Sequence, residues 1–215
     1  MKITDITQQA KNPKRYSIFV DGRFAFGIHG VDLLCHGLEI GDVLDDGQLD
    51  KIRHEAEFAA ARDSAVKYLG RGIKSNKQVR DNLEAKEFSR ESIDKVVEML
   101  TQRGYLDDIA YAAAFIAQKT KLNNFGRYRI EQELRAKGVS DKNIKLAYAN
   151  MDDEGEERDD LTIAKSALEK KLRHKDITQI AQNPKDVQKL KAFLARRGFD
   201  FETADKVVDI FLQKK

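Results

Sequence analysis

Several residue types are scarce in this chain of 215 residues, and each shortage excludes a class of protein. The single cysteine, Cys35, cannot form an internal disulfide, which fits a reducing compartment. No apolar run approaches the ~20 residues that span a bilayer, and the first residues, MKITDITQQA, lack the apolar segment of a secretory signal. The chain has two prolines and no tryptophan, and 41% of its residues are hydrophobic and 35% charged. This composition is typical of a helix-rich soluble protein with a thin core. We therefore expect a cytoplasmic protein with no membrane partner.

Residues that carry catalysis are equally scarce. Four histidines are scattered along the chain without the spacing of a helical zinc site: His29, His36, His54 and His174. The sequence has no P-loop, no G-x-S-x-G and no G-x-G-x-x-G motif. Two alternatives stay open, a metal cluster of His29, Cys35 and His36, and a metal-dependent hydrolase that uses Asp107, Asp108 and a histidine. Ordinary hairpin and helix roles are favoured for the first set, and a helix N-cap and first turn for the two aspartates. We expect no catalytic residue, no cofactor and no metal.

The formal net charge of +3 is unevenly distributed. Residues 152–160 hold seven acids and one arginine, a local charge of −6, which leaves +9 on the rest of the chain. We interpret this acidic run as a solvated connector, with docking on a basic partner as the alternative. A surface that is basic elsewhere attracts polyanions.

Strand signals are confined to the N-terminal residues. Asp21-Gly22 is the sequence preferred in a type I′ hairpin turn, and it separates two short apolar segments, 16–20 and 23–27. Alternation gives each strand one apolar face, formed by Tyr16, Ile18 and Val20 and by Phe24, Phe26 and Ile28. Residues 2–8 could add a third strand, and a short helical turn over 31–36 should end at Gly37. A lone hairpin is marginally stable, so a helix has to cover this sheet.

That covering helix is predicted over about 46–69, with Asp45 and Gln48 as a capping box. Its apolar stripe comprises Leu49, Ile52, Ala56, Ala59, Ala60, Val66 and Leu69. The first half of the helix should cover the sheet, and the second half should belong to the first of three repeats.

The rest of the chain repeats one apolar pattern three times. The middle copy, 125–151, has seven apolar positions: Ile130, Leu134, Val139, Ile144, Ala147, Tyr148 and Met151. A shift of 51 residues towards the N-terminus places them on Val79, Leu83, Phe88, Ile93, Val96, Val97 and Leu100. A shift of 60 residues the other way places them on Leu190, Leu194, Phe199, Ala204, Val207, Val208 and Phe211. Self-similarity of this kind indicates a repeat architecture.

Each copy is predicted to contain three helices. The first helix carries 65–69, 112–116 or 163–172, and a loop that lengthens along the chain follows it. The second helix begins at a cap, formed by Ser75 with Gln78 in copy one and by Asn183 with Pro184 in copy three. It ends at Gly138 or Gly198, where a left-handed residue is needed; copy one has Glu87 there, at a cost of about 1 kcal/mol. The third helix begins at Ser89, Ser140 or Asp200.

None of these short helices can bury its apolar face alone, so the copies should stack. We therefore predict a mainly α protein, with three tandem three-helix repeats in an elongated curved solenoid and a small N-terminal β-hairpin or sheet. The predicted domains are 1–50, 51–105, 106–152 and 153–215, and we expect a monomer.

Lysine and arginine residues recur in the equivalent region of each copy, in the loop before the second helix and in that helix. Copy one carries Arg71, Lys74, Lys77 and Arg80. Copy two carries Lys119, Lys121, Arg127, Arg129, Arg135 and Lys137, with Phe125 and Tyr128 interleaved. Copy three carries Lys171 and Arg173 in a basic run, and Arg196-Arg197 closes its second helix. In a curved stack these residues would form a positive stripe for a phosphate backbone, although helix surfaces are also routinely rich in such residues. Because the sequence has no base-reading motif, the protein should contact the phosphate backbone of a nucleic acid and recognise its shape, not its bases.

Three motifs resemble the RecX family of recombination regulators, from about residue 60 to the C-terminus. The first motif is Tyr68-Leu69-x-Arg71-x-x-Lys74-Ser75. The second is Leu100-x-x-Arg103-Gly104-Tyr105-Leu106-Asp107-Asp108-x-x-Tyr111-Ala112. The third is Gly126-x-x-Arg129-Ile130-x-x-Glu133-Leu134-x-x-Lys137-Gly138-Val139. Glu87 and Lys74 depart from the family pattern, which has glycine and more often arginine at these positions.

The resemblance implies a regulator without an active site of its own. Family members are understood to bind in the groove of the filament that the RecA recombinase forms on DNA. They thereby inhibit its ATP hydrolysis, strand exchange and co-protease activities, and DNA binding is also reported for the family. RecA as the specific partner follows from the resemblance alone. A general binder of single- or double-stranded nucleic acid is the alternative.

Overall fold

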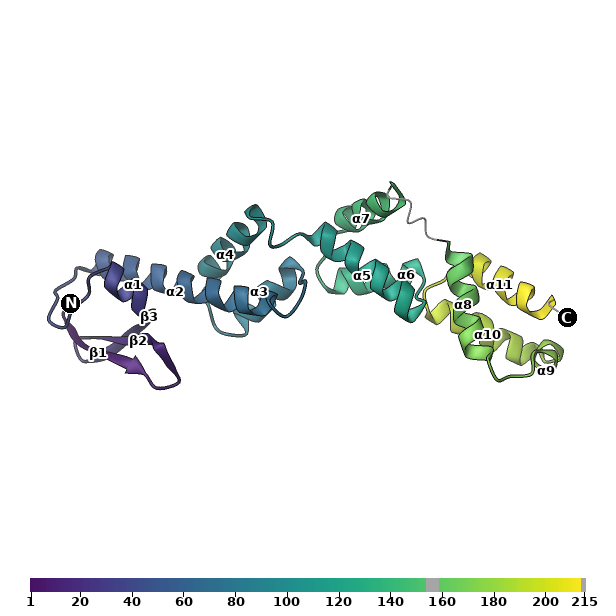
Figure 1. Ribbon diagram of the computed structural model, residues 1–215, viewed down its shortest axis with the longest axis horizontal. Helices are drawn as coiled ribbons and strands as arrows, with labels where there is room; N and C mark the ends of the chain where they lie inside the picture. The colour runs from purple at the N-terminus through teal and green to yellow at the C-terminus, as the bar shows by residue number, and fades with distance from the viewer. Residues whose placement is uncertain (154–158, 214–215) are drawn as a thin grey trace. The chain divides into compact units, whose positions relative to one another are not determined.

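The computed structural model describes residues 1–153 and 159–213, and the chain divides into two compact units, Met1–Leu106 and Asp107–Lys215. The first unit contains β1 (Ile3–Gln9), β2 (Asn12–Val20), β3 (Arg23–His29), α1 (Gly30–Cys35), α2 (Asp46–Leu69), α3 (Asn76–Glu84) and α4 (Arg90–Gln102) (Figure 1). The second contains α5 (Asp108–Asn123), α6 (Arg127–Ala136), α7 (Asp141–Asp153), α8 (Asp160–Leu172), α9 (Ile177–Gln182), α10 (Pro184–Arg196) and α11 (Phe201–Gln213). The mainly α fold with a small N-terminal sheet is confirmed. The curved solenoid concerns how the two units are arranged and stays a prediction.

The N-terminal sheet is antiparallel with the order β1-β2-β3, so the third strand is confirmed. Asp21 and Gly22 both have positive φ, 48° and 76°, as a type I′ turn requires. The prediction that Phe24 shares the apolar face of β3 is wrong. Ile18 pairs with Phe26 but Phe19 pairs with Phe24, so β3 has one extra residue at this point, a β-bulge. The bulge turns Phe24 out of the core, and its exposed fraction is 61%.

Helix α2 belongs to two cores, as predicted. Its capping box of Asp45 and Gln48 is present. Leu49, Ile52 and Ala56 pack with the sheet, whereas Ala61 and Ala65 pack with the first repeat. The predicted stripe is wrong in its second half, because Val66 is 53% exposed and Ala61 and Ala65 take the buried positions.

Each repeat encloses a core of its own. The seven aligned apolar positions of each copy lie in three separate clusters of buried side chains. All are buried except Phe88 and Met151, which are half-buried. The three three-helix repeats are thus confirmed, with one addition. The long loop of copy three forms the short helix α9, which packs on α10 and α11.

The same turn ends the second helix of every repeat. The backbone N–H of Phe88, Val139 and Phe199 donates to the carbonyl oxygens of Leu83, Leu134 and Leu194. The residue before each donor is left-handed, with φ of 62° at Glu87, 82° at Gly138 and 90° at Gly198. This is the bond from C″ to C3 of a Schellman motif. Glu87 therefore adopts a backbone that suits glycine, as the sequence predicted.

The predicted N-caps are confirmed. Ser75 with Gln78 forms a capping box at α3, and Asn183 caps α10, with Pro184 in its first turn. The third helices of the repeats are capped by Ser89, Ser140 and Asp200. Asp107 caps α5, accepting hydrogen bonds from the N–H groups of Ile109 and Ala110 at 2.7 and 3.1 Å. Most of the predicted acidic connector, 152–160, lies outside the described residues.

Candidate nucleic-acid interface

The second and third repeats meet where α6 begins and α10 ends, inside the second unit. The N–H of Gly126 donates to the carbonyl oxygen of Arg197 at 2.8 Å, and the N–H of Tyr128 donates to that of Gly198 at 3.2 Å. Gly126, the N-cap of α6, offers no side chain, so a backbone carbonyl of repeat three satisfies an N–H group at this helix end. The cations beside this contact are therefore held by two repeats at once.

Five cations lie over three phenylalanine rings at this contact, and we call them the cation–aromatic cluster. Its members are Lys119, Arg129, Lys137, Lys171 and Arg197, with Phe115, Phe125 and Phe193. The guanidinium carbons of Arg129 and Arg197 lie 3.9 and 5.7 Å from the centre of the Phe125 ring. Cation–π contacts of this kind contribute about 0.5–2 kcal/mol each. Rings and cations thus form one connected surface across the two repeats.

Neighbouring rings share cations, which makes the cluster continuous. Lys119 lies over both Phe115 and Phe125, at 5.0 and 5.5 Å from their centres. Arg197 lies over both Phe125 and Phe193, and Lys171 completes the series 4.2 Å from the centre of Phe193. At the other end, Lys137 shares Phe115 with Lys119.

The positive charges of the cluster act on one another. Burial lowers the pKa of Arg197, and the charge of Arg129 lowers it further. Burial likewise lowers the pKa of Lys171, with further lowering by Lys175, Arg196 and Arg197. Burial is the larger cause of both shifts, and the neighbouring positive charges add to it. A bound anion would offset the disfavoured charge.

The carboxylate of Glu133 lies among these cations. It is 3.0 Å from Lys119 Nζ and 3.2 Å from Arg129 Nε. Burial alone would raise the pKa of Glu133, but hydrogen bonds from Lys119 and Arg129 outweigh it, and the pKa lies below its usual value. Glu133 thus positions two cations, while the cluster as a whole keeps an excess of positive charge. Such a surface suits a phosphate backbone or a strongly acidic protein surface.

Other predicted residues of copy two lie on a different face of α6. Arg127 pairs with Glu131 at 2.8 Å and stacks on Tyr148. Arg135 pairs with Glu131 at 3.1 Å and with Asp141 at 2.6 Å. These four charged groups, with Lys145, line a crevice of about 200 Å³ between α6 and α7. Both arginines are paired with carboxylates, so they are less suited to bind an anion.

The remaining predicted residues are spread out. Tyr128, Lys121 and Arg173 are exposed. In the first unit, Lys77 pairs with Asp81, Arg80 with Asp94, and Lys74 lies over Tyr68, while Arg71 is exposed. The structure thus brings together Lys119, Arg129, Lys137 and Lys171 of the predicted set. Arg197, named with Arg196 among the basic residues of copy three, joins them over Phe125 and Phe193.

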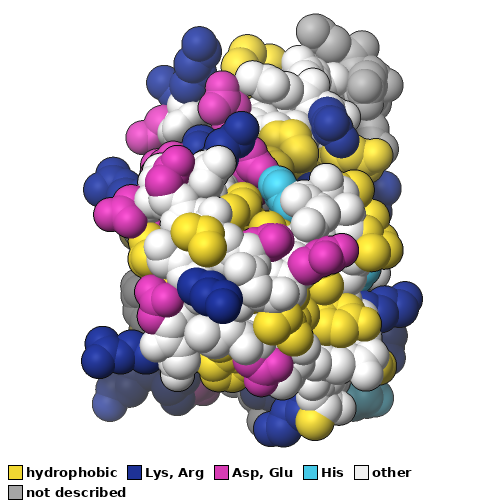
Figure 2. Space-filling view, turned by 90° about the vertical axis from the view of Figure 1, so that its left-hand side faces the viewer, with side chains coloured by type: hydrophobic (Ala, Val, Ile, Leu, Met, Phe, Trp, Pro, Cys, Tyr) yellow, Lys and Arg dark blue, Asp and Glu magenta, His cyan; other side chains and the backbone are white. Residues whose placement is uncertain are grey.

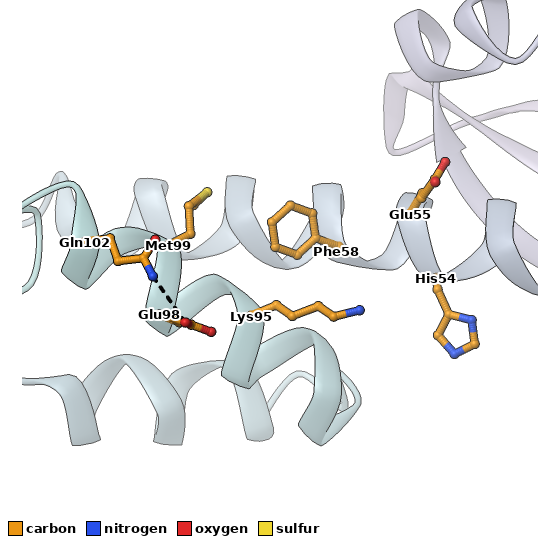
Figure 3. Close-up of a pocket in the computed structure, with 7 residues that line it drawn as sticks. All are labelled: His54, Glu55, Phe58, Lys95, Glu98, Met99 and Gln102. Atoms are coloured by element: carbon orange, nitrogen blue, oxygen red, sulfur yellow. Dashed lines mark hydrogen bonds between the residues drawn. The ribbon is translucent and has the colours of Figure 1, made fainter.

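A cavity of about 450 Å³ lies between α2 and α4 in the first unit (Figure 3). His54 and Glu55 leave α2 in different directions, and Lys95 extends along the cavity (Figure 3). Lys95 pairs with Glu91 at 2.7 Å, and Glu98 accepts a hydrogen bond from Gln102 at 3.1 Å. Lys95 and Glu98 are thus engaged along their own helix.

The residues considered for metal chemistry have local structural roles. His29 Nδ1 accepts a hydrogen bond from the N–H of Val31 and caps α1, and His36 lies 3.3 Å from the carboxylate of Glu55. Residues 1–153 and 159–213 contain no group of three or more His, Cys, Asp or Glu side chains that could hold a metal ion. In the same ranges, no helix has the length and apolarity to cross a membrane.

Four domain models of one family match consecutive parts of the chain. They are the "Regulatory protein RecX N-terminal domain" at residues 1–45 and the first, second and third three-helix domains of RecX at 61–100, 107–147 and 157–208. A solved structure, "Crystal structure of regulatory protein RecX", aligns with a TM-score of 0.65 and 26% identity over 97% of this chain and 98% of that one. RecX from Lactobacillus salivarius, at 18% identity and a TM-score of 0.60 over 72% of this chain and 96% of that one, supports the fold alone.

Sequence relatives agree with these matches. Regulatory protein RecX of Bacillus subtilis is 32% identical over 209 residues, which are 96% of this chain and 76% of that protein. The protein of the same name from Leuconostoc mesenteroides is 34% identical, over 97% of this chain and 75% of the relative. A Clostridium botulinum relative is 30% identical over 96% of this chain and 94% of its own length. The four domain matches and these identities show that the chain belongs to the RecX family of regulatory proteins.

Proposed function

We propose that this chain is a non-catalytic regulator that binds the RecA recombinase and the DNA it coats, in the cytoplasm and as a monomer. In this proposal it inhibits the ATPase, strand-exchange and co-protease activities of the filament. A regulatory role is what family membership supports, and RecA as the partner follows from the family resemblance. The observation that carries the proposal is the cation–aromatic cluster, in which five cations converge over three phenylalanine rings.

The cluster fits a partner that presents regularly spaced negative charge. A guanidinium over a ring presents its hydrogen-bond donors at its edge, where those that are not used within the protein can meet phosphate or carboxylate oxygens. Arg129 donates from Nη1 to the carbonyl oxygen of Arg196 at 3.2 Å, and Arg197 donates from Nη1 to that of Asn123. Because the Gly126 backbone joins the two repeats, the cations hold a fixed spacing and lose little entropy on binding. A filament of DNA and protein offers phosphates and acidic side chains along its length. A single site of this kind could therefore contact both components.

The direct test uses purified RecA, single-stranded DNA and ATP. Adding this protein at substoichiometric to equimolar ratios to RecA should lower the rate of ATP hydrolysis. An unchanged rate at every ratio contradicts the proposal. Binding to the same DNA without RecA, measured in parallel at one salt concentration, separates an effect on the filament from simple competition for DNA.

The second candidate is a general nucleic-acid-binding module that acts without RecA. The same cluster supports it, because contacts to a phosphate backbone need no recombinase. Its affinity for DNA alone should then be tight at physiological salt and fall steeply as salt rises, with a log–log slope of about −0.9 per phosphate neutralised. Weak binding to DNA alone, together with inhibition of RecA, favours the first candidate.

A further inference from the structure

A second cavity of the first unit lies beside the β-bulge that turns Phe24 outward. It has a volume of about 410 Å³ and is lined by Phe24, Phe26, Arg15, Arg53, His54 and Phe88, among others. Phe26 is buried and Phe88 is half-buried, so the floor is apolar. Phe24 is 61% exposed and is therefore free to contact a ligand. Bulges are frequent where a side chain is re-aimed at a functional site.

Phe24 differs from the rings of the cation–aromatic cluster. A guanidinium or ammonium of the protein lies over Phe115, Phe125 and Phe193, which leaves less ring surface for a ligand. In the described parts of the chain no cation lies over Phe24, and its ring neighbour is Phe19, edge to face with centroids 6.0 Å apart. An edge-to-face neighbour steadies a ring and leaves its faces available.

The arginines of this cavity differ in how far they are neutralised. Arg53 lies 3.0 Å from Asp50, whereas Arg15 donates to the neutral carbonyl of Gly27 at 2.9 Å. The cavity's carboxylate, Glu57, already accepts hydrogen bonds from the N–H and hydroxyl of Ser89, at 2.7 and 2.8 Å. Arg15 thus keeps a positive charge that the described acidic groups do not neutralise. Gly27 makes room for it, since a Cβ there would lie 3.2 Å from Arg15 Nη2.

We infer that this cavity binds an unstacked base of a single-stranded nucleic acid. The base stacks on Phe24, and a flanking phosphate pairs with Arg15 and Arg53. An exposed aromatic ring beside guanidinium groups is the arrangement that single-strand binding sites use, and each stacked base contributes about 1–3 kcal/mol. A duplex keeps its bases stacked inside and cannot use the ring. The site goes beyond the proposed function, because it needs neither RecA nor the cation–aromatic cluster.

Charges of both signs lie at this end of the first unit and in the cavity itself. Figure 2 faces the end of the first unit that carries the sheet, and it shows Lys and Arg side chains interspersed with Asp, Glu and apolar ones. The cavity is lined by Glu57 as well as by Arg15 and Arg53. Mixed charge gives little long-range attraction for a polyanion. Affinity at this site should therefore depend on the ring itself and less on salt.

A tryptophan placed at the site can report on the contact, because the chain has no tryptophan of its own. In Phe24→Trp, an oligothymidylate of about 16 nucleotides should quench the fluorescence at fixed salt. A duplex of the same length and a strand of the same length without bases should not. Phe201→Trp, at a position that is 77% exposed on α11, is the matched control and should respond to none of the three. Equal quenching by the strand without bases contradicts the inference.

A second variant measures the contribution of the ring. Phe24→Leu keeps an apolar side chain but cannot stack, so affinity for the single strand should fall about tenfold, while Phe201→Leu leaves it unchanged. Far-ultraviolet circular dichroism and thermal melting check that both variants fold. In a chain that also carries Arg129→Gln and Arg197→Gln, the Phe24→Trp signal should persist. An unchanged affinity in Phe24→Leu, or a signal lost with the two arginines, overturns the inference whatever the outcome of the RecA test.

Discussion

Gly126 and Gly198 lie in direct backbone contact, one from the second repeat and one from the third. A Cβ built on Gly126 would lie 2.3 Å from the carbonyl carbon of Gly198, and a Cβ on Gly198 would lie 2.4 Å from the backbone nitrogen of Arg129. The two glycines therefore let α6 begin against the end of α10. Arg129 and Arg197, next to this contact, reach the same phenylalanine ring because the backbones approach so closely.

Gly126→Ala should loosen this joint. The clash is with backbone atoms, which cannot rotate away, so we expect a loss of about 1–3 kcal/mol in the free energy of unfolding. Gly70→Ala is the matched control. Gly70 has φ of −59°, and its Cβ would meet atoms no closer than 3.6 Å, so this change should be neutral or slightly stabilising. Denaturant melts of the two variants give the comparison, and equal stabilities would show that the joint tolerates a methyl group.

Leu134→Ala tests the repeated core. Leu134 is fully buried in the second repeat, and its loss should cost ~2–5 kcal/mol through lost burial and the cavity left behind. Leu122→Ala, at a position that is 69% exposed, should cost far less. Urea unfolding of both variants measures the difference. A cost below ~1 kcal/mol for Leu134→Ala would show that the repeat alignment is wrong.

Substitutions at two left-handed turn positions should change the stability in opposite directions. Glu87→Gly should stabilise the first repeat by about 1 kcal/mol, because φ of 62° strains a residue with a Cβ. Gly138→Ala should destabilise the second repeat by about 1 kcal/mol for the same reason. Thermal melting should move up for the first variant and down for the second. A shift in the same direction for both is inconsistent with a shared turn geometry.

The pKa of Glu133 predicts a dependence of stability on pH. Its pKa in the folded protein lies below the ordinary value of 4.5, because Lys119 and Arg129 outweigh the effect of burial. Ionised Glu133 therefore stabilises the fold above that value, and the contribution is lost as the pH falls through the folded pKa. Glu133→Gln should melt below the wild type at neutral pH, and the difference should shrink as the pH falls through the folded pKa of Glu133. Glu169→Gln, on an exposed position of α8, is the control. A melting difference that does not change with pH would rule out this linkage.

Much of the fold could be predicted because the local signals are strong. Asp21-Gly22, the Ser75–Gln78 capping box and the thrice-repeated apolar spacing each have one structural meaning, and each is confirmed. The errors arose where one residue changes the phase of a pattern. An extra residue in β3 turns Phe24 to the surface. The alternation of apolar and polar residues does not indicate where such a bulge occurs. Helix α2 passes from one core to the next between Ala56 and Ala61, so a single stripe continued to Val66 could not describe its second half.

The candidate site was harder to predict than the fold. Charge composition pointed to copy two, but it could not tell Arg127 from Arg129, which are two residues apart on α6. The former lies in a balanced network with Glu131, and the latter joins the cation–aromatic cluster. Arg197 reaches the cluster only because two glycines far apart in sequence allow two repeats to touch. Tertiary contacts of this kind leave no local pattern.

Two matched double variants can assign the proposed inhibition of RecA either to the cation–aromatic cluster or to the other face of α6. Arg129→Gln/Arg197→Gln removes two cations of the cluster, and Arg127→Gln/Arg135→Gln removes two cations that are paired with Glu131 and Asp141. Both remove the same charge, so a purely non-specific electrostatic effect would treat them alike.

The measurement is the ATPase rate of RecA on single-stranded DNA as a function of added protein, at two salt concentrations. Our account predicts that Arg129→Gln/Arg197→Gln raises the concentration needed for half-inhibition at least tenfold and weakens its salt dependence by about one unit of log–log slope per arginine. Arg127→Gln/Arg135→Gln should stay within about threefold of the wild type. Equal inhibition by the two variants, or a greater loss in the second, would contradict the claim that the cation–aromatic cluster carries the function.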